Sequence, residues 1–191
     1  MAKKIVAVAR SPLAAHSAIN TETYRQQEIA PLTKIIIRGK SDDSAFMQAI
    51  KSVLDAELPL TPNSTVELKD PKKQARILWL GPEEWLLWTS ADKHGSTLDA
   101  LQTATREHHA AIIDVSDYYT IIRISGSNAK GALMQGCPLD LRERAFSEGN
   151  CAQSHYRNTG ILLYCGKDYY DVQVRWSFAN YLWEYFATVG E

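Results

Sequence analysis

The order of strand-like and helix-like segments along this chain limits its fold more than any other feature. An apolar run precedes a segment with apolar residues three and four apart; further apolar runs then flank a Gly-Pro turn, and a weaker helix and another run follow. The segments are, in order, Ile35–Ile37, Phe46–Leu54, Val66–Leu68, Ile77–Leu80, Trp85–Trp88, Ser90–His109 and Ile112–Val115. This is the order of a split βαβ unit.

The second half of the chain repeats this order more loosely. Strand-like runs surround a short helix that ends at Gly136, and a strongly aromatic helix follows the last run. The segments are Tyr119–Ile124, Ala129–Met134, Cys151–Tyr156, Ile161–Tyr164, Tyr170–Val174 and Trp176–Ala187. The sequence therefore predicts an α+β fold of interleaved split βαβ (ferredoxin-like) units with mixed sheets.

Two helices have informative ends or faces. Ser41 or Asp42 is expected to cap the first helix, with Asp43 in its first turn, where the helix dipole favours a negative charge. The last helix has only Ser177, Asn180 and Glu184 as a polar stripe, so we expect it to be buried on more than one side. Both sides can lie within its own domain, or a partner chain can complete one of them.

Residues 11 to 33 contain two prolines, many polar residues and no sustained period. We therefore expect residues 1–33 to form an extended arm outside the core and residues 34–191 to form a single α+β domain.

The composition describes a soluble globular protein. The 191 residues carry a net charge of −1, with 45% hydrophobic and 23% charged residues, and no concentrated basic face for nucleic acid is evident. No window is apolar enough to span a membrane, and the apolar run before Arg10 is too short for an export signal. Cys137, Cys151 and Cys165 are odd in number and widely spaced, which favours reduced thiols in the cytoplasm.

The glycines and histidines predict no cofactor or metal site. The segment Gly126–Ala132 resembles a phosphate-binding loop, but Ala132 and Leu133 stand where that loop needs Lys and then Ser or Thr. A strand-to-helix turn capped by Ser127 explains it better. The adjacent His108 and His109 would point about 100° apart on a helix and cannot share a metal. The remaining histidines, also without ligand spacing, are His16, His94 and His155.

The nucleophile candidates fail on similar grounds. Cys137 follows the carboxyl end of a helix, an unfavourable place for a thiolate. Asp114, Ser116 and Asp117 cluster between strands without a nearby histidine, so turn formation explains them better than nucleophilic chemistry. The sequence therefore predicts no catalytic, cofactor-binding or metal-binding residue in this chain.

An ordered set of short motifs carries a family resemblance that spans nearly the whole chain. The motifs are Arg10–Leu13, Leu58–Asn63, Trp79–Leu87, Asp114–Ser116, Gly136–Leu141, Cys151–Gln153 and Arg175–Trp183. Together they resemble the gamma subunit of heterotetrameric sarcosine oxidase, a family similar in fold to the folate-binding domain of the aminomethyltransferases.

The resemblance implies a function within a complex. It implies a cytoplasmic assembly of alpha, beta, gamma and delta chains that oxidatively demethylates sarcosine to glycine, forming hydrogen peroxide and, with tetrahydrofolate, methylene-tetrahydrofolate. FAD, FMN, NAD, zinc and tetrahydrofolate are then expected in the other subunits, and this chain would be non-catalytic and bound mainly to alpha. Since Arg and Trp are enriched at interface centres, the sequence nominates Arg142, Arg144, Arg175 and Trp176 as contacts.

One departure bears on the rival hypotheses. Similar aminomethyltransferases carry adjacent aspartates before a strand like Ile161–Tyr164, whereas Thr159 and Gly160 stand there in this chain. Neither residue exchanges a proton at neutral pH, which favours a binding role. The alternatives are a free-standing folate-binding protein or folate-dependent transferase of the same fold, and an adaptor for another enzyme.

Overall fold

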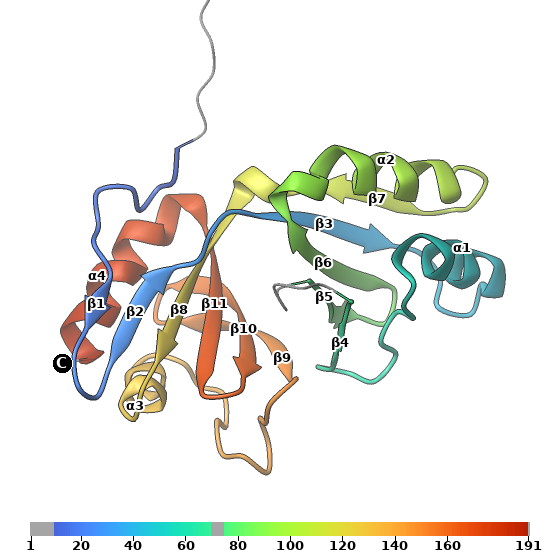
Figure 1. Cartoon of the computed structure of the whole chain (residues 1–191). Coiled ribbons are helices and arrows are strands. Elements are labelled where there is room, and N and C mark those ends of the chain that lie inside the picture. The colour runs from blue at the N-terminus through green and yellow to red at the C-terminus, as the bar shows by residue number, and fades with distance from the viewer. Residues whose placement is uncertain (1–9, 70–74, 191) are drawn as a thin grey trace, which may run out of the picture.

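The computed structural model describes residues 10–69 and 75–190, and within these ranges the strands form two sheets with helices on their outer sides (Figure 1). The residues before Arg10 that were weighed as an export signal lie outside the described ranges. The helices are α1 (Ser44–Leu54), α2 (His94–Ala104), α3 (Ala129–Met134) and α4 (Ala179–Gly190), with 3₁₀ turns η1 (Ala91–Lys93), η2 (Ser116–Tyr118) and η3 (Trp176–Phe178). The strands are β1 (Ile19–Asn20), β2 (Arg25–Glu28), β3 (Leu32–Arg38), β4 (Thr65–Glu67), β5 (Arg76–Gly81), β6 (Glu84–Ser90), β7 (Ala111–Asp114), β8 (Tyr119–Ser125), β9 (Cys151–Tyr156), β10 (Thr159–Gly166) and β11 (Tyr169–Arg175).

The first lobe, Leu32–Asp114, is built from consecutive elements. Its sheet runs β4-β5-β6-β3-β7, so β3, β5, β6 and β7 have the strand order of a ferredoxin-like unit, with β4 added at one edge. Phe46 and Ile50 of α1 and Leu101 of α2 pack on this sheet's outer face with Ile35 and Ile37. This confirms the predicted split βαβ unit.

The second lobe takes a strand from the other end of the chain. Its sheet runs β1-β2-β8-β11-β10-β9, with α3 and α4 on the outer face. In the ferredoxin-like order, β8, β10 and β11 lack the fourth strand that would follow the last helix, and β2 fills that place beside β8. The α+β class with interleaved units is confirmed. Among the described residues, however, every strand pair is antiparallel, so the sheets are not mixed.

The segment expected to be an arm is part of the core where it is described, residues 10–33. Tyr24 is fully buried and donates its hydroxyl to Gln26, and the Gln26 amide donates to the backbone oxygen of Trp183 in α4. Gly126, at φ +96°, faces this segment so closely that a Cβ would lie 2.4 Å from the Thr23 backbone oxygen. The interpretation as an arm is wrong here because the polar sequence hides alternately buried residues; the single-domain assignment of residues 34–191 stays a prediction.

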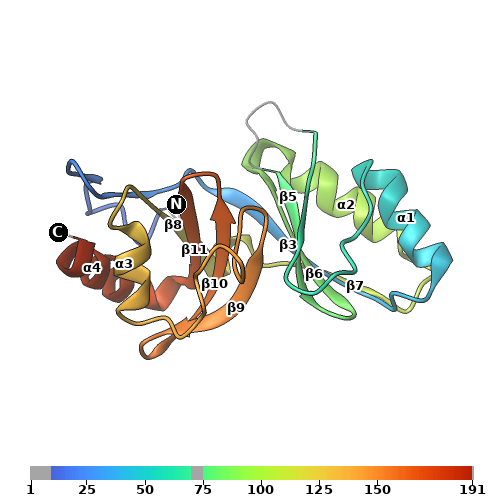
Figure 2. The same cartoon turned by 90° about the horizontal axis from the view of Figure 1, so that it is seen from below.

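The inner faces of the sheets pack against one another, giving the helix, sheet, sheet, helix layering visible from below (Figure 2). Leu86 and Trp88 of β6 meet Leu162 and Tyr164 of β10, and the Trp88 indole donates to the Gln173 side chain at 2.9 Å. Strands covered on both faces read as continuous apolar runs, which explains the sequence signal at Ile35–Ile37.

Several element ends differ from the sequence prediction. Asp43, rather than Ser41 or Asp42, caps α1 by accepting from the backbone N–H groups of Ala45 and Phe46. Asn128, not Ser127, is the residue before α3, and no side chain caps that helix. The stretch 90–109, predicted to contain a helix, holds α2 at His94–Ala104, and α4 starts at Ala179 after η3 rather than at Trp176.

Candidate partner interface and pockets

The four nominated interface residues lie at opposite ends of the second sheet. Arg142 and Arg144 are in the loop between α3 and β9. This loop lies at the Gly166 end of β10, where the Gly149 N–H donates to the backbone oxygen of Cys165. Arg175 ends β11 and Trp176 begins η3, at the far end of the strand that starts beside Gly166. They do not form one surface, and their role in partner contact stays a prediction.

In the loop between α3 and β9, Arg142 pairs with a residue of the same loop. The Arg142 guanidinium donates to both carboxylate oxygens of Asp140, at 2.7 and 2.6 Å. This hydrogen bonding lowers the pKa of Asp140 to about 2. The pair is exposed, so it orders the loop and adds little to the free energy of unfolding.

Exposed aromatic rings gather at the other end of β11. Tyr118 is 51% exposed, Trp176 48% and Phe178 39%, and the Arg175 guanidinium donates to the Tyr118 hydroxyl at 3.0 Å. We call Tyr118, Arg175, Trp176 and Phe178 the aromatic surface. Aromatic residues and arginine are enriched in protein interfaces.

Sequence reasoning found only part of this surface. Arg175 and Trp176 were nominated from residue type, whereas Tyr118 lies next to Asp114, Ser116 and Asp117, which were interpreted only as turn-forming residues. The sequence left open whether the aromatic helix α4 is buried within its own domain or against a partner chain. The helix buries one stripe, Ala179, Leu182, Trp183 and Phe186, within its own lobe and leaves Tyr181 39% exposed.

A cavity of about 580 Å³, which we call the junction pocket, opens beside Trp176 where the chain crosses from β2 to β3. Its walls come from four separate stretches of the chain. They are Arg10, Ser11, Pro12, Glu28, Ile29, Ala30, Pro31, Leu32, Lys34, Ser116, Asp117, Tyr119, Thr120, Ile121 and Trp176. Largely apolar walls with a few converging polar groups are typical of small-molecule sites.

The polar groups of this pocket are an acid held by hydroxyls and a buried amine. Each Glu28 carboxylate oxygen accepts from a hydroxyl, one from Ser11 and one from Thr120. The Lys34 ammonium, on a side chain only 3% exposed, donates to the backbone oxygens of Leu32 and Ser116 at 3.1 and 3.2 Å. Burial lowers the pKa of Lys34 to about 8, against the opposing charges of Asp117, Asp114 and Glu28.

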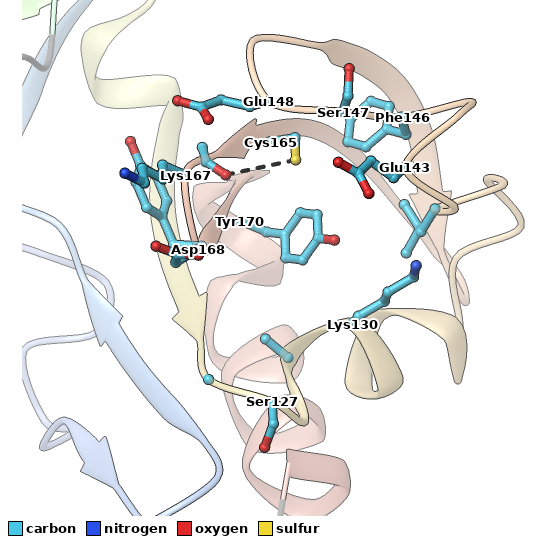
Figure 3. A pocket seen from close by; sticks show the side chains of 15 residues that line it. Ser127, Lys130, Glu143, Phe146, Ser147, Glu148, Cys165, Lys167, Asp168 and Tyr170 are labelled. Atoms are coloured by element: carbon cyan, nitrogen blue, oxygen red, sulfur yellow. Dashed lines mark hydrogen bonds between the residues drawn. The ribbon is translucent and has the colours of Figure 1, made fainter.

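A more open cavity of about 720 Å³ lies at the Gly166 end of the second sheet (Figure 3). Lys130 of α3, Glu143 and Tyr170 face it, and the Cys165 thiol contacts the Gly166 backbone oxygen. Burial raises the pKa of Cys165, Glu148 adds to the rise, and Lys130 opposes it. The thiol is therefore protonated at neutral pH and a weak nucleophile.

The remaining candidates have structural roles. Asp114 accepts from the Ser116 backbone N–H and hydroxyl, the expected turn, and also faces His94 at 3.3 Å. His108 lies 3.5 Å from the capping Asp43. Within residues 10–69 and 75–190, no group of His, Cys, Asp and Glu side chains could hold a metal ion. All three cysteines fall in these ranges and are free and buried.

The fold is that of a two-lobed α+β protein with the aromatic surface at one end of its second sheet. Comparison with known proteins gives the family. The sarcosine oxidase, gamma subunit family matches residues 38–190, and the chain belongs to that family. In the described part of the chain, no helix has the length and apolar character to cross a membrane.

Curated relatives are all moderately similar. A sarcosine oxidase subunit gamma from Corynebacterium sp. (strain U-96) is 30% identical over 106 residues, which cover 55% of this chain and 51% of the relative. One from Arthrobacter sp. is 28% identical over 138 residues, covering 72% and 65%. The chain thus spans about half the length of the first relative and just under two thirds of the second.

Solved structures share the fold. A chain of the heterotetrameric sarcosine oxidase from Corynebacterium sp. U-96 is 24% identical with a TM-score of 0.85, covering 95% of this chain and 94% of that one. The glycine cleavage system aminomethyltransferase T from Bartonella henselae is 11% identical with a TM-score of 0.65, covering 86% and 45%. The expected likeness to the aminomethyltransferase fold is confirmed. Thr159 and Gly160, compared above with that family's aspartates, begin β10.

Proposed function

We propose that this chain is the gamma subunit of a heterotetrameric sarcosine oxidase that oxidatively demethylates sarcosine to glycine. Hydrogen peroxide is the second product, and with tetrahydrofolate the methyl carbon leaves as methylene-tetrahydrofolate. The family match over residues 38–190 carries this proposal, and the TM-score of 0.85 to a chain of such a heterotetramer supports it.

Within that complex, the proposed role of this chain is docking rather than catalysis. FAD, FMN, NAD, zinc and tetrahydrofolate belong to the alpha, beta and delta partners, and alpha is the main contact. Support comes from the aromatic surface, where three large rings and a guanidinium stand exposed at one end of a sheet. Three buried, unpaired thiols agree with a cytoplasmic complex.

Co-purification tests both the assembly and the surface. A tagged chain expressed with the neighbouring genes of its native host should retain alpha, beta and delta subunits, identified by mass spectrometry. Trp176→Ala combined with Phe178→Ala should cut the recovered partners by at least about tenfold, because large aromatic anchors dominate interface energies. Leu60→Ala, a substitution of an exposed apolar residue in the first lobe, is the matched control.

Two results would contradict the proposal. If the chain is recovered alone from its native host, the proposed assembly is wrong. If the double variant recovers the partner subunits in full, the aromatic surface is not part of the interface. Saturable heat on titrating the isolated chain with tetrahydrofolate would instead favour the free-standing folate-binding alternative.

A further inference from the structure

The junction pocket holds two opposite charges that do not neutralise each other directly. Glu28 has only neutral hydroxyls as partners, and among the described residues it makes no ion pair. Lys34 senses the charge of Glu28, yet its ammonium hydrogen bonds go to two backbone oxygens. Both residues line the cavity, and no hydrogen bond or ion pair joins their side chains.

The remaining hydrogen-bonding capacity matches those charges. An ammonium has three donors, and two of the Lys34 donors are used. Each carboxylate oxygen of Glu28 accepts once and has a second lone pair. A ligand with a carboxylate at one end and an ammonium at the other can therefore satisfy both groups.

The rest of the lining limits the ligand's shape. Pro12, Ile29 and Ile121 supply apolar wall, and Trp176, which is 48% exposed, also lines the pocket. Trp and Tyr faces attract organic ammonium groups, which adds to the pull of Glu28. A lone anion is disfavoured because Asp117 also lines the pocket, and a lone cation is disfavoured by Lys34 and Arg10.

We propose that the junction pocket is a binding site for a small zwitterionic amino acid, with Glu28 facing its ammonium group and Lys34 facing its carboxylate. The site uses residues of this chain alone and does not depend on the docking role. The chain would then bind a ligand of its own, although we propose that it is non-catalytic.

The test is a titration of the full chain with sarcosine and with its isomer L-alanine. In spectra of the ¹⁵N-labelled protein, the indole signal of Trp176, assigned by its loss in Trp176→Phe, should shift saturably. Calorimetry should show that sarcosine methyl ester, which lacks the carboxylate, and N-acetylglycine, which lacks the ammonium, bind at least about tenfold more weakly than the zwitterions.

Variants then test the two charged groups. Glu28→Gln keeps the size of the side chain and should weaken binding by at least about tenfold. Glu22→Gln, an exposed acid of the same segment outside the pocket lining, should leave the affinity unchanged. Trp176→Leu replaces a half-exposed residue without threatening the fold and should weaken binding severalfold, so the proposal remains testable if Glu28→Gln misfolds.

Clear outcomes overturn the proposal. One is a folded chain that binds neither sarcosine nor L-alanine. Another is a folded Glu28→Gln variant with the affinity of the parent chain, and a third is a set of shifts centred on Cys165 and Tyr170 rather than on Trp176. Failure of the co-purification would not affect this result, because the titration uses the chain by itself.

Discussion

The two lobes have the same strand order but close it in different ways. The first lobe takes its strands from one continuous stretch, Leu32–Asp114, and its outer core lies between that sheet and helices α1 and α2. The second lobe is complete only when β2, near the other end of the chain, pairs with β8 and bonds to α4. The difference teaches that integrity of the second lobe depends on contacts across nearly the full chain length, whose entropic cost must be met by buried, specific bonds.

The largest effect should follow from removing the anchor of β2. Tyr24→Ala should lower the free energy of unfolding by about 3–5 kcal/mol, since it deletes a fully buried ring and removes the hydroxyl that donates to the side-chain oxygen of Gln26. Urea unfolding followed by tryptophan fluorescence measures this loss. Tyr118→Ala, the same substitution at a half-exposed site, should cost less than about 1 kcal/mol. Equal losses in both variants would mean that β2 is not an anchor.

The next effect compares one ion pair in each lobe. Arg123 in the second lobe donates twice to Asp171, which is 1% exposed, at 2.7 and 2.8 Å. Asp171→Asn should cost about 3 kcal/mol, because it leaves a partly buried guanidinium without its counter-charge. In the first lobe, Arg38 pairs with Glu84 on the surface, and Glu84→Gln should cost less than about 1 kcal/mol. Denaturant midpoints of the two variants check the difference, and a larger loss for Glu84→Gln would reverse it.

The same contrast explains what the sequence could reveal. The first lobe was predicted almost element by element, because Ile35–Ile37 and Trp85–Trp88 are covered on both faces and stand out as apolar runs. In β2, Arg25–Glu28 reads as polar, although Gln26 is fully buried, so tertiary bonding decides its place and no local signal shows it.

The candidate sites divide in the same way. Arg175 and Trp176 could be nominated from residue type alone. Tyr118, their neighbour in the aromatic surface, could not, because only the packing of η2 beside β11 brings them together. The junction pocket joins residues near positions 10, 30, 117 and 176, so its walls come together only after both lobes have closed.

A smaller, pH-dependent effect should arise where the lobes join. The folded chain favours the neutral Lys34 amine, since burial lowers its pKa from the ordinary 10.5 to about 8. Between about pH 8 and 10.5 the unfolded chain therefore binds more protons, and stability from this group rises with pH. Lys34→Met lacks this titration, so the stability of the parent chain relative to the variant should increase from pH 8 to pH 10 in urea unfolding. Parallel pH profiles for the two proteins would contradict the assignment.

The smallest effect should stay within the first lobe. Asp43 caps α1 by accepting hydrogen bonds from the backbone N–H groups of Ala45 and Phe46. The bond from Phe46 is the main cause of the lowered pKa of Asp43. Asp43→Ala removes both bonds and should speed amide hydrogen exchange in the first turn of α1 while leaving exchange in α4 unchanged. Asp42→Ala is the matched control, because Asp42 was an equally good cap candidate by sequence yet does not cap the helix.

The contribution of this cap to stability also depends on pH. Since folding favours the ionised carboxylate of Asp43, its contribution is present at neutral pH and is lost as the pH falls through its lowered pKa. Faster exchange spreading into α4 would show that the two lobes open together, and the contrast between a locally closed lobe and one closed by β2 would then fail.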